Sequence, residues 1–139
     1  MDCIFCKIIK GDIPSYTIYE DDIVKVFLDV NPMSPGHMLI IPKKHFENLD
    51  DIDIDTLTHI NEIAKKMHIL LKEKLNIDGM SIIQNNGDVQ EVKHYHMHLK
   101  PYYKENNGIS VEEVYKKLIG WNAPLRVDIN KKTVQKEMC

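Results

Sequence analysis

The stretch Lys93-His94-Tyr95-His96-Met97-His98-Leu99 carries three histidines at alternate positions. Side chains alternate between the two faces of a β-strand, so this stretch predicts a strand with a row of imidazoles on one face. Tyr95, Met97 and Leu99 then point to the opposite face. Imidazole can act as a nucleophile, a general acid or a metal ligand near neutral pH. A row of three is an unusual way to fill a core, so we interpret it as a functional site.

The row by itself leaves two chemistries open. Two imidazoles on one face of a strand can reach a single zinc ion, and a catalytic zinc site needs three protein ligands and one open position. Alternatively, one imidazole attacks as a nucleophile while its neighbours handle protons and charge. The spacing is the same in both cases, so the surrounding residues have to distinguish them.

Neutral amide side chains precede the row. Ser81-Ile82-Ile83-Gln84 predicts a strand, and Asn85-Asn86-Gly87-Asp88 predicts a turn, because Gly, Asn and Asp accept the backbone conformations that turns require. Gln90 follows, four residues before His94. Asn85 and Gln90 are explained by ordinary turn polarity, but such amides beside a histidine strand can also hold a phosphate without adding charge.

These residues, with several segments before them, resemble the histidine-triad (HIT) nucleotide-binding family, whose signature is His-φ-His-φ-His-φ-φ, and in particular its bacterial-type, Hint-like branch. The resemblance covers about residues 3 to 101 and keeps the family's order. The matching segments upstream of the turn are residues 4–14, 19–22, 27–32 and 35–45.

Two features depart from the family's pattern. The glycine-rich turn is shortened, with Val89 before Gln90 and Glu91 after it, and a carboxylate near a phosphate is unfavourable unless it points away or meets a cation. Leu99 is followed by Lys100, where the family often has a second apolar residue. The phosphate loop is therefore expected to be reshaped.

The resemblance implies nucleotidyl transfer to a histidine. His96 would attack the α-phosphorus as a neutral imidazole, with a backbone carbonyl accepting its Nδ1 proton. His98 would contact the phosphoryl oxygens or the leaving group, and Asp29 would hold the ribose hydroxyls. Four apolar side chains would wall the base, although such side chains also serve as plain core. The matching positions are His94, His96, His98 and His37 for catalysis, and Asp29, Asn85, Gln90, Ile4, Phe5, Ile8 and Leu39 for nucleotide binding.

A Cys-x-x-Cys pair, Cys3 and Cys6, stands near the beginning of the sequence. Two thiolates at this spacing can share one zinc ion, but a complete site needs two more ligands. The residues alone slightly favour two free cysteines with apolar neighbours. The resemblance implies that His45 and His94 complete a closed structural zinc site, as in some bacterial-type members, in which His94 orients the site through the metal.

Length and composition predict one domain and exclude some classes of function. A chain of 139 residues suits a single domain with a real core. A net charge of -3 argues against nucleic-acid binding, which needs a basic surface. The longest apolar run, residues 38–41, is far too short to cross a bilayer, and no export signal is visible. With three cysteines and no disulfide framework, a cytoplasmic location is expected.

The patterning predicts an α+β fold. Residues 17–19 and 24–28 predict a hairpin around an acidic turn, 20–22, and residues 37–42 predict a buried strand. Apolar residues at i, i+3 and i+4 predict a helix over 55–75 with Asp55 as its N-cap, and residues 110–118 predict a short helix. We expect a five-stranded antiparallel sheet with one long helix. A HIT domain would span residues 1–105, with the extension 106–139 in the same domain.

The sequence leaves three candidate functions for this protein. The favoured one is hydrolysis of a nucleotide phosphoramidate or a dinucleoside polyphosphate through a nucleotidyl-histidine intermediate. A zinc-dependent hydrolase that uses the histidine row is the first alternative, although it leaves Cys3 and Cys6 unexplained. A nucleotide-binding interaction module with little catalysis is the second, and Glu91 keeps it open. The resemblance implies a homodimer that binds a purine nucleotide or nucleotide ester.

Overall fold

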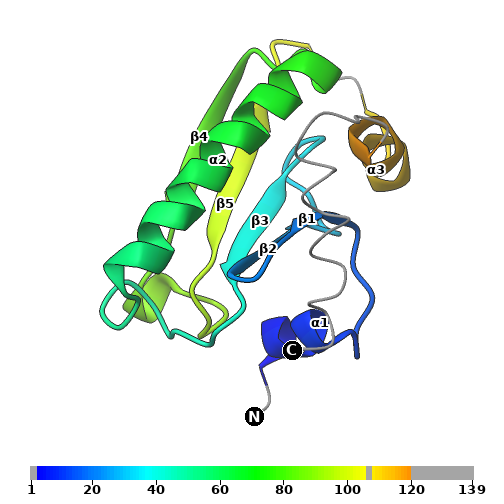
Figure 1. Ribbon diagram of the computed structural model, residues 1–139. Helices are drawn as coiled ribbons and strands as arrows, with labels where there is room; N and C mark the ends of the chain where they lie inside the picture. Colours follow the sequence, from blue (N-terminus) through cyan, green and yellow to red (C-terminus); the bar gives the residue numbers. More distant parts are fainter. Residues whose placement is uncertain (1–2, 106–107, 120–139) are drawn as a thin grey trace.

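The computed structural model describes residues 3–105 and 108–119 of the chain, and its centre is one antiparallel sheet (Figure 1). Its five strands lie in the order β1-β2-β3-β5-β4. Every neighbouring pair is antiparallel, which confirms the predicted α+β class with a five-stranded antiparallel sheet. The strands are β1 (Thr17–Glu20), β2 (Val24–Leu28), β3 (Met38–Pro42), β4 (Gly79–Gln84) and β5 (Met97–Tyr102).

The long helix α2 (Ile54–Leu75) covers one face of the sheet, called here the α2 face. Its apolar stripe packs on alternate residues of the central strands, among them Ile40 and Leu99, which are fully buried. The predicted helix is correct except at its beginning. Asp53 is the N-cap in place of Asp55, because its side chain reaches the free N–H of Thr56 at 3.1 Å. The buried helix residues are Ile60, Ile63, Ala64, Met67, Leu70, Leu71 and Leu75.

The short helix α1 (Ile4–Lys10) packs on the opposite face, called here the α1 face. Phe5, Ile8 and Ile9 are buried there against side chains of β2 and β3, such as Phe27 and Leu39. Strands β2 and β3 are therefore covered on both faces, and each divides its apolar side chains between two separate clusters.

A third helix, α3 (Val111–Ile119), begins and ends one residue later than the predicted 110–118. The Ser110 hydroxyl accepts from the backbone N–H of Glu113 at 3.1 Å, so this serine caps the helix. Val114 and Leu118 join the larger core. The predicted division into 1–105 and 106–139 stays a prediction, and most of the second segment lies outside the described residues.

Two sequence-predicted strand starts near the site are wrong, each because a backbone N–H finds a partner outside the sheet. Strand β5 begins at Met97, so His94 and His96 lie in its lead-in, where the N–H of Tyr95 donates to the carbonyl of Phe46 at 2.7 Å. Strand β3 begins after His37, whose N–H closes a turn onto Ser34 at 3.0 Å. The predicted turn at 85–88 contains the start of a 3-10 helix, η1 (Gly87–Val89).

The predicted acidic turn at 20–22 also differs. Glu20 belongs to β1 and is buried, and the Nζ atom of Lys43 lies 2.8 Å from its carboxylate. This cation makes burial of the carboxylate tolerable, which the charge pattern of the turn did not indicate.

In the described parts of the chain, no helix is both long and apolar enough to span a membrane.

Candidate active site and metal centre

The alternation predicted for the histidine row holds in the structure, even though the strand begins later than expected. Tyr95, Met97 and Leu99 are buried in the α2-face core. His96 and His98 point to the α1 face and line a pocket there. Side chains alternate along any extended backbone, whether or not its hydrogen bonds are made within a sheet. The predicted alternation is therefore correct although the strand begins later.

His96 is held with one ring nitrogen free. Its Nδ1 lies 2.8 Å from the backbone carbonyl of His94, and because a carbonyl can only accept, Nδ1 carries the proton. The Nε2 lone pair is then available for attack. Burial lowers the pKa of His96 below its usual 6.5, while the carbonyl and the charge of Glu91 act in the opposite direction. The imidazole is therefore neutral at pH 7.

A chain of hydrogen bonds fixes the tautomer of His98. The backbone N–H of Met33 donates to Nδ1 of His37 at 3.1 Å, so His37 carries its proton on Nε2. That Nε2 lies 3.0 Å from Nδ1 of His98 and donates to it, which leaves the proton of His98 on its own Nε2. Burial, then His96 and His37, lower the pKa of His98 to about 4. His98 is thus a neutral hydrogen-bond donor beside the nucleophile.

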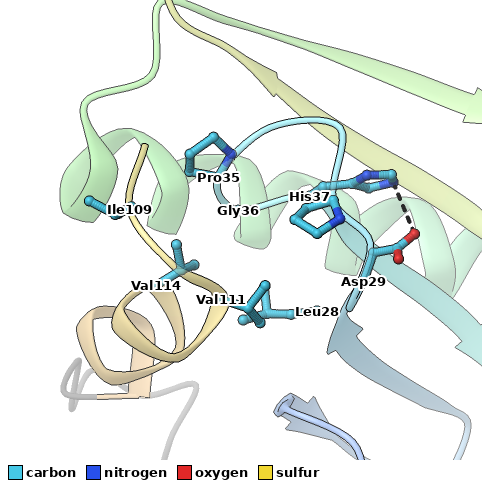
Figure 2. Close-up of a pocket in the computed structure, with 9 residues that line it drawn as sticks. Leu28, Asp29, Pro35, Gly36, His37, Ile109, Val111 and Val114 are labelled. Atoms are coloured by element: carbon cyan, nitrogen blue, oxygen red, sulfur yellow. Dashed lines mark ion pairs between the residues drawn. The ribbon is translucent and has the colours of Figure 1, made fainter. Parts of the chain in front are cut away.

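The loop that carries His37 lies on the same cavity as helix α3. Figure 2 shows His37 and Asp29 at the edge of a small cavity whose other walls include Val111 and Val114 of α3. A carboxylate oxygen of Asp29 lies 3.7 Å from Nε2 of His37. Burial lowers the pKa of His37, although Asp29 acts against this shift. Helix α3 and the loop that carries His37 therefore form walls of the same cavity.

One pocket of about 740 Å³ on the α1 face gathers most of the residues that the resemblance implied. A cavity of this size is typical of a site for a small molecule or cofactor. Asp29 and Asn85 bring polar atoms to the pocket beside the three histidines, as do Ser15, Asn31, Glu91 and Lys100, and the other lining side chains are apolar. The sequence-predicted residues that line it are His37, His96, His98, Asp29, Asn85, Ile4, Phe5, Ile8 and Leu39.

Gln90 is the predicted nucleotide-binding residue that the structure does not bring to this pocket. Its side chain is buried, and its amide donates to the backbone carbonyl of Glu47 at 2.6 Å. The N–H of Gln90 closes η1 onto Gly87, and this short helix turns the side chain inward. In this structure its amide is engaged by the backbone, so its contact with a phosphate stays a prediction.

Several pocket residues were not predicted from the sequence, among them Phe27, Met33 and Lys100. Lys100 could have been found, because it continues the period of two that places His96 and His98 on this face. Phe27 also follows the strand period. Met33 lies in an irregular loop, where no periodic signal exists.

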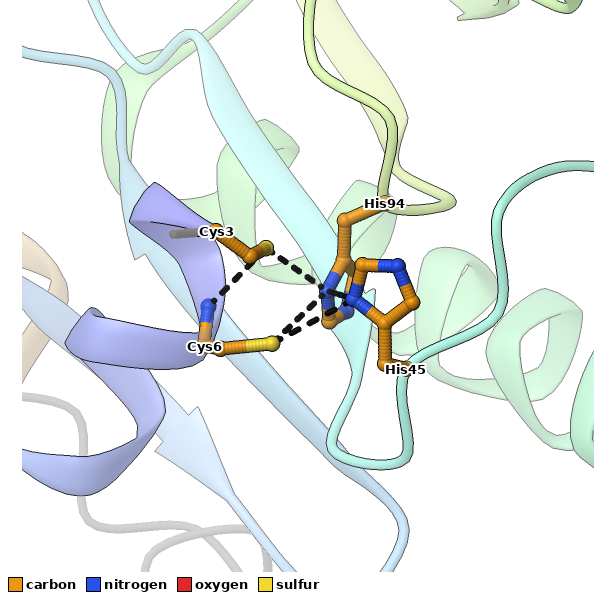
Figure 3. Close-up of side chains that lie close together, drawn as sticks. All are labelled: Cys3, Cys6, His45 and His94. Carbon is orange, nitrogen blue, oxygen red and sulfur yellow. Dashed lines mark hydrogen bonds between the residues drawn. The ribbon is translucent and has the colours of Figure 1, made fainter. Parts of the chain in front are cut away.

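The predicted metal ligands converge at the N-terminal end of α1, as Figure 3 shows for Cys3, Cys6, His45 and His94. The Cys3 sulfur lies 3.3 Å from Nδ1 of His94, the Cys6 sulfur lies 3.3 Å from Nδ1 of His45, and the two Nδ1 atoms are 3.1 Å apart. Ligands of one tetrahedral zinc lie about 3.3–3.8 Å from one another, from Zn–S and Zn–N bond lengths. The four donors therefore fit a closed zinc site.

The protonation of His94 supports a cation at this point. Its Nε2 lies 2.8 Å from the carbonyl of Pro42 and must carry the proton, so its Nδ1 lone pair faces His45 and the two sulfurs. Burial is the main cause that lowers the pKa of His94 to about 4. Burial and the neighbouring Cys3 raise the pKa of the Cys6 thiol to about 11. A metal ion would displace that proton and use the exposed lone pairs.

The three histidines of the row do not converge on one point. Among the described residues, the groups that could hold a metal are the Cys3 cluster and a second group of Asp29, His37 and His98. His94 belongs to the first group and His98 to the second, while His96 belongs to neither. The hydrogen-bond chain through His37 accounts for the second group without an ion.

Comparison with known proteins agrees with this geometry. The family model for the HIT domain matches residues 10–105. An uncharacterised HIT-like protein of Methanocaldococcus jannaschii is 43% identical over 129 residues, covering 85% of this chain and 99% of its own. Adenosine 5'-monophosphoramidase HNT1 of Saccharomyces cerevisiae is 42% identical over 123 residues, covering 87% and 70%. A Zn-bound histidine triad family protein from Mycobacterium smegmatis superposes with a TM-score of 0.80 at 32% identity, covering 86% and 92%.

Proposed function

Because this chain belongs to the histidine-triad (HIT) family, we propose that it is a nucleotide hydrolase acting on the α-phosphate through a nucleotidyl-histidine intermediate on His96. One observation carries the proposal. The His94 carbonyl holds Nδ1 of His96 at 2.8 Å, which leaves Nε2 as a neutral nucleophile in the pocket. The phosphoramidase named among the relatives supports the same reaction class.

The reaction has two steps. In the first, the Nε2 lone pair of His96 forms a bond to the α-phosphorus while the bond to the leaving group breaks and its electron pair departs with that group. The imidazole becomes cationic, and the His94 carbonyl stabilises it through the Nδ1 proton. A departing amine takes up a proton from solvent as its bond breaks, whereas a departing phosphate leaves as an anion. In the second step, water gives its hydroxyl to phosphorus and its other proton to solvent. The electron pair of the P–N bond returns to His96.

The other pocket residues position the substrate. The Nε2–H of His98 is placed to donate to a phosphoryl oxygen or to the leaving atom, since its Nδ1 accepts from His37. Asn85 supplies a neutral amide, Asp29 the ribose contacts, and Phe5 an apolar wall for a purine base. Gln90 reaches the phosphate only if its bond to the Glu47 carbonyl opens on binding. Catalysis of this kind rests on positioning and charge stabilisation.

Zinc is the proposed structural cofactor, held by Cys3, Cys6, His45 and His94. It would neutralise the thiolates and fix the helix that walls the pocket to the lead-in of β5. The distances among the donors and the zinc bound by the M. smegmatis relative support this proposal. His94 then acts by position, because its carbonyl orients His96.

We propose a cytoplasmic homodimer, in which reduced cysteines remain available to zinc. Strand β4 supports the dimer, because it is an edge of the sheet and its Ile82 is 53% exposed. Sedimentation equilibrium of the full chain tests this assembly, and a monomer across micromolar concentrations would contradict it.

A substrate panel separates the candidate functions. Purified protein is assayed with nucleoside phosphoramidates and dinucleoside polyphosphates, before and after chelation. We expect turnover by the native protein, and turnover abolished in His96→Asn with nucleotide binding retained. His68→Asn, on α2, serves as the matched control. Full activity in folded His96→Asn would refute the mechanism. Binding without any turnover by the native protein would favour an interaction module.

A further inference from the structure

Lys100 extends the histidine row by one more position. It lies two residues beyond His98 on β5, so both side chains leave the sheet on the α1 face, and both line the nucleotide pocket. Lys100 is half-buried, and it takes no part in the ion pairs found among the described residues. A half-buried cation without a carboxylate partner, in a pocket built for a phosphate, is suited to an anionic ligand.

The order of the strands shows which part of a substrate would meet Lys100. The apolar wall for the base comes from α1, β2 and β3, through residues such as Phe27 and Leu39. His98 belongs to the next strand, β5, His96 lies in the lead-in of that strand, and β4 lies beyond it. Ser81 of β4 pairs with Lys100 across the sheet. With the nucleoside over β2 and β3, the group on the other side of the phosphate extends toward β5 and β4.

The charge of Lys100 is close to the reacting histidines. It acts on both His98 and His37 in the direction that lowers their pKa values, opposite to the effect of Asp29. Glu91, which also lines the pocket, acts on His96, whose pKa burial lowers overall. Among the described residues that line this pocket, Lys100 is the one lysine or arginine, so it is the cation that the pocket offers to a leaving group.

A second hollow continues from this point. It shares Lys100 and Met33 with the nucleotide pocket, so the two are contiguous. Lys104 adds a second cation and Ser81 a hydroxyl, while Tyr102 offers an aromatic ring that is 59% exposed. We call this hollow the leaving-group groove. Its lining includes Met33, Ser34, Ser81, Lys100, Tyr102 and Lys104.

We propose that Lys100 is a specificity-determining residue that binds an anionic leaving group, so that this protein prefers substrates whose leaving group bears phosphate to those that release a neutral amine. The inference rests on the proposed function. When the bond between the α-phosphorus and the bridging oxygen breaks, its electron pair stays on the departing phosphate. The ammonium of Lys100 offsets the negative charge that grows there, and the leaving-group groove holds the remainder of that group.

The test compares two substrates that share an adenylyl group and differ in the charge of the leaving group. kcat/KM is measured for diadenosine tetraphosphate and for adenosine 5'-phosphoramidate, with the native protein, Lys100→Met, Lys100→Arg and the control Lys66→Met on the exposed side of α2. Methionine keeps the length and the apolar stem of lysine, and thermal melting confirms that each variant is folded.

Lys100→Met should lower kcat/KM for the tetraphosphate by roughly 10- to 100-fold, the loss typical of one charge-assisted hydrogen bond. The loss for the phosphoramidate should be clearly smaller, Lys100→Arg should recover much of the selectivity, and Lys66→Met should keep it. Equal losses for both substrates, or a native protein that turns over only the phosphoramidate, would overturn this inference and leave the proposed function standing. A native protein that hydrolyses neither substrate would overturn both.

Discussion

Gly36→Ala should destabilise the protein strongly, although the substitution adds only one methyl group. Gly36 has a φ of +91°, and a Cβ atom there would lie 2.9 Å from Leu71 Cδ2 and 2.9 Å from Leu75 Cδ1. It would also lie 3.2 Å from Cγ of Pro101. All three neighbours are buried, so the loop that carries His37 is seated against α2 and β5 only because this position lacks a side chain.

Two costs add in this variant. A non-glycine residue in the left-handed region costs about 1–3 kcal/mol, and overpacking a core costs about 1–3 kcal/mol more. Gly11→Ala is the matched control, because Gly11 has a φ of +87° but its added Cβ would meet no atom within 4 Å. The control carries the backbone cost alone, so the difference between the two variants measures the steric contact.

Urea unfolding followed by circular dichroism, at one fixed protein concentration, gives both values. We expect Gly36→Ala to be less stable than Gly11→Ala by about 1–3 kcal/mol, which corresponds to roughly 3–15 °C in Tm for a domain of this size. If the two variants have the same free energy of unfolding, the close packing of this loop on α2 is wrong, and with it our explanation of how His37 is positioned.

The remaining predictions concern metal and pH. Metal analysis of freshly prepared, reduced protein should find about one zinc per chain. Cys6→Ser should lower Tm clearly while most of kcat is retained. Freshly prepared protein without zinc would refute the metal site and leave the catalytic proposal intact. Burial lowers the pKa of His96 below 6.5 and brings that of His98 to about 4, so His96 becomes protonated at a lower pH than a free imidazole and His98 stays neutral down to about pH 4. The acid-side decline of kcat/KM should therefore be centred below pH 6.5, whereas a decline centred at or above 6.5 would contradict the effect of burial.

The long helix and the faces of the sheet could be predicted because they follow from periodicity. The apolar stripe of α2 repeats over six turns, so a two-residue shift of its cap from Asp55 to Asp53 leaves the packing unchanged. The alternation from His94 to His98 needs only an extended backbone. Where β5 begins could not be predicted, because the carbonyl of Phe46, far away in the sequence, takes the N–H of Tyr95.

The site was predictable in composition but not in all its contacts. Spacing alone could not bring His45 and His94 to the cysteines, since Cys6 and His45 are 39 positions apart, and the resemblance to a family supplied that pairing. The inward turn of Gln90 depends on the carbonyl of Glu47, to which no local pattern pointed. The end of the chain, residues 120–139, lies outside the described residues.

Detection of a covalent adduct on His96 tests the central claim most directly. A histidine nucleophile must pass through a nucleotidyl-imidazole, whereas a metal-bound hydroxide leaves no covalent trace on the protein. The protein is mixed with adenosine 5'-phosphoramidate at neutral pH and quenched in base, which preserves the P–N bond, and the added mass is mapped by peptide sequencing. We predict an adenylyl group on His96. Rapid sampling through a productive turnover that never shows this adduct, together with loss of catalysis on chelation, would contradict the account in favour of a zinc hydrolase.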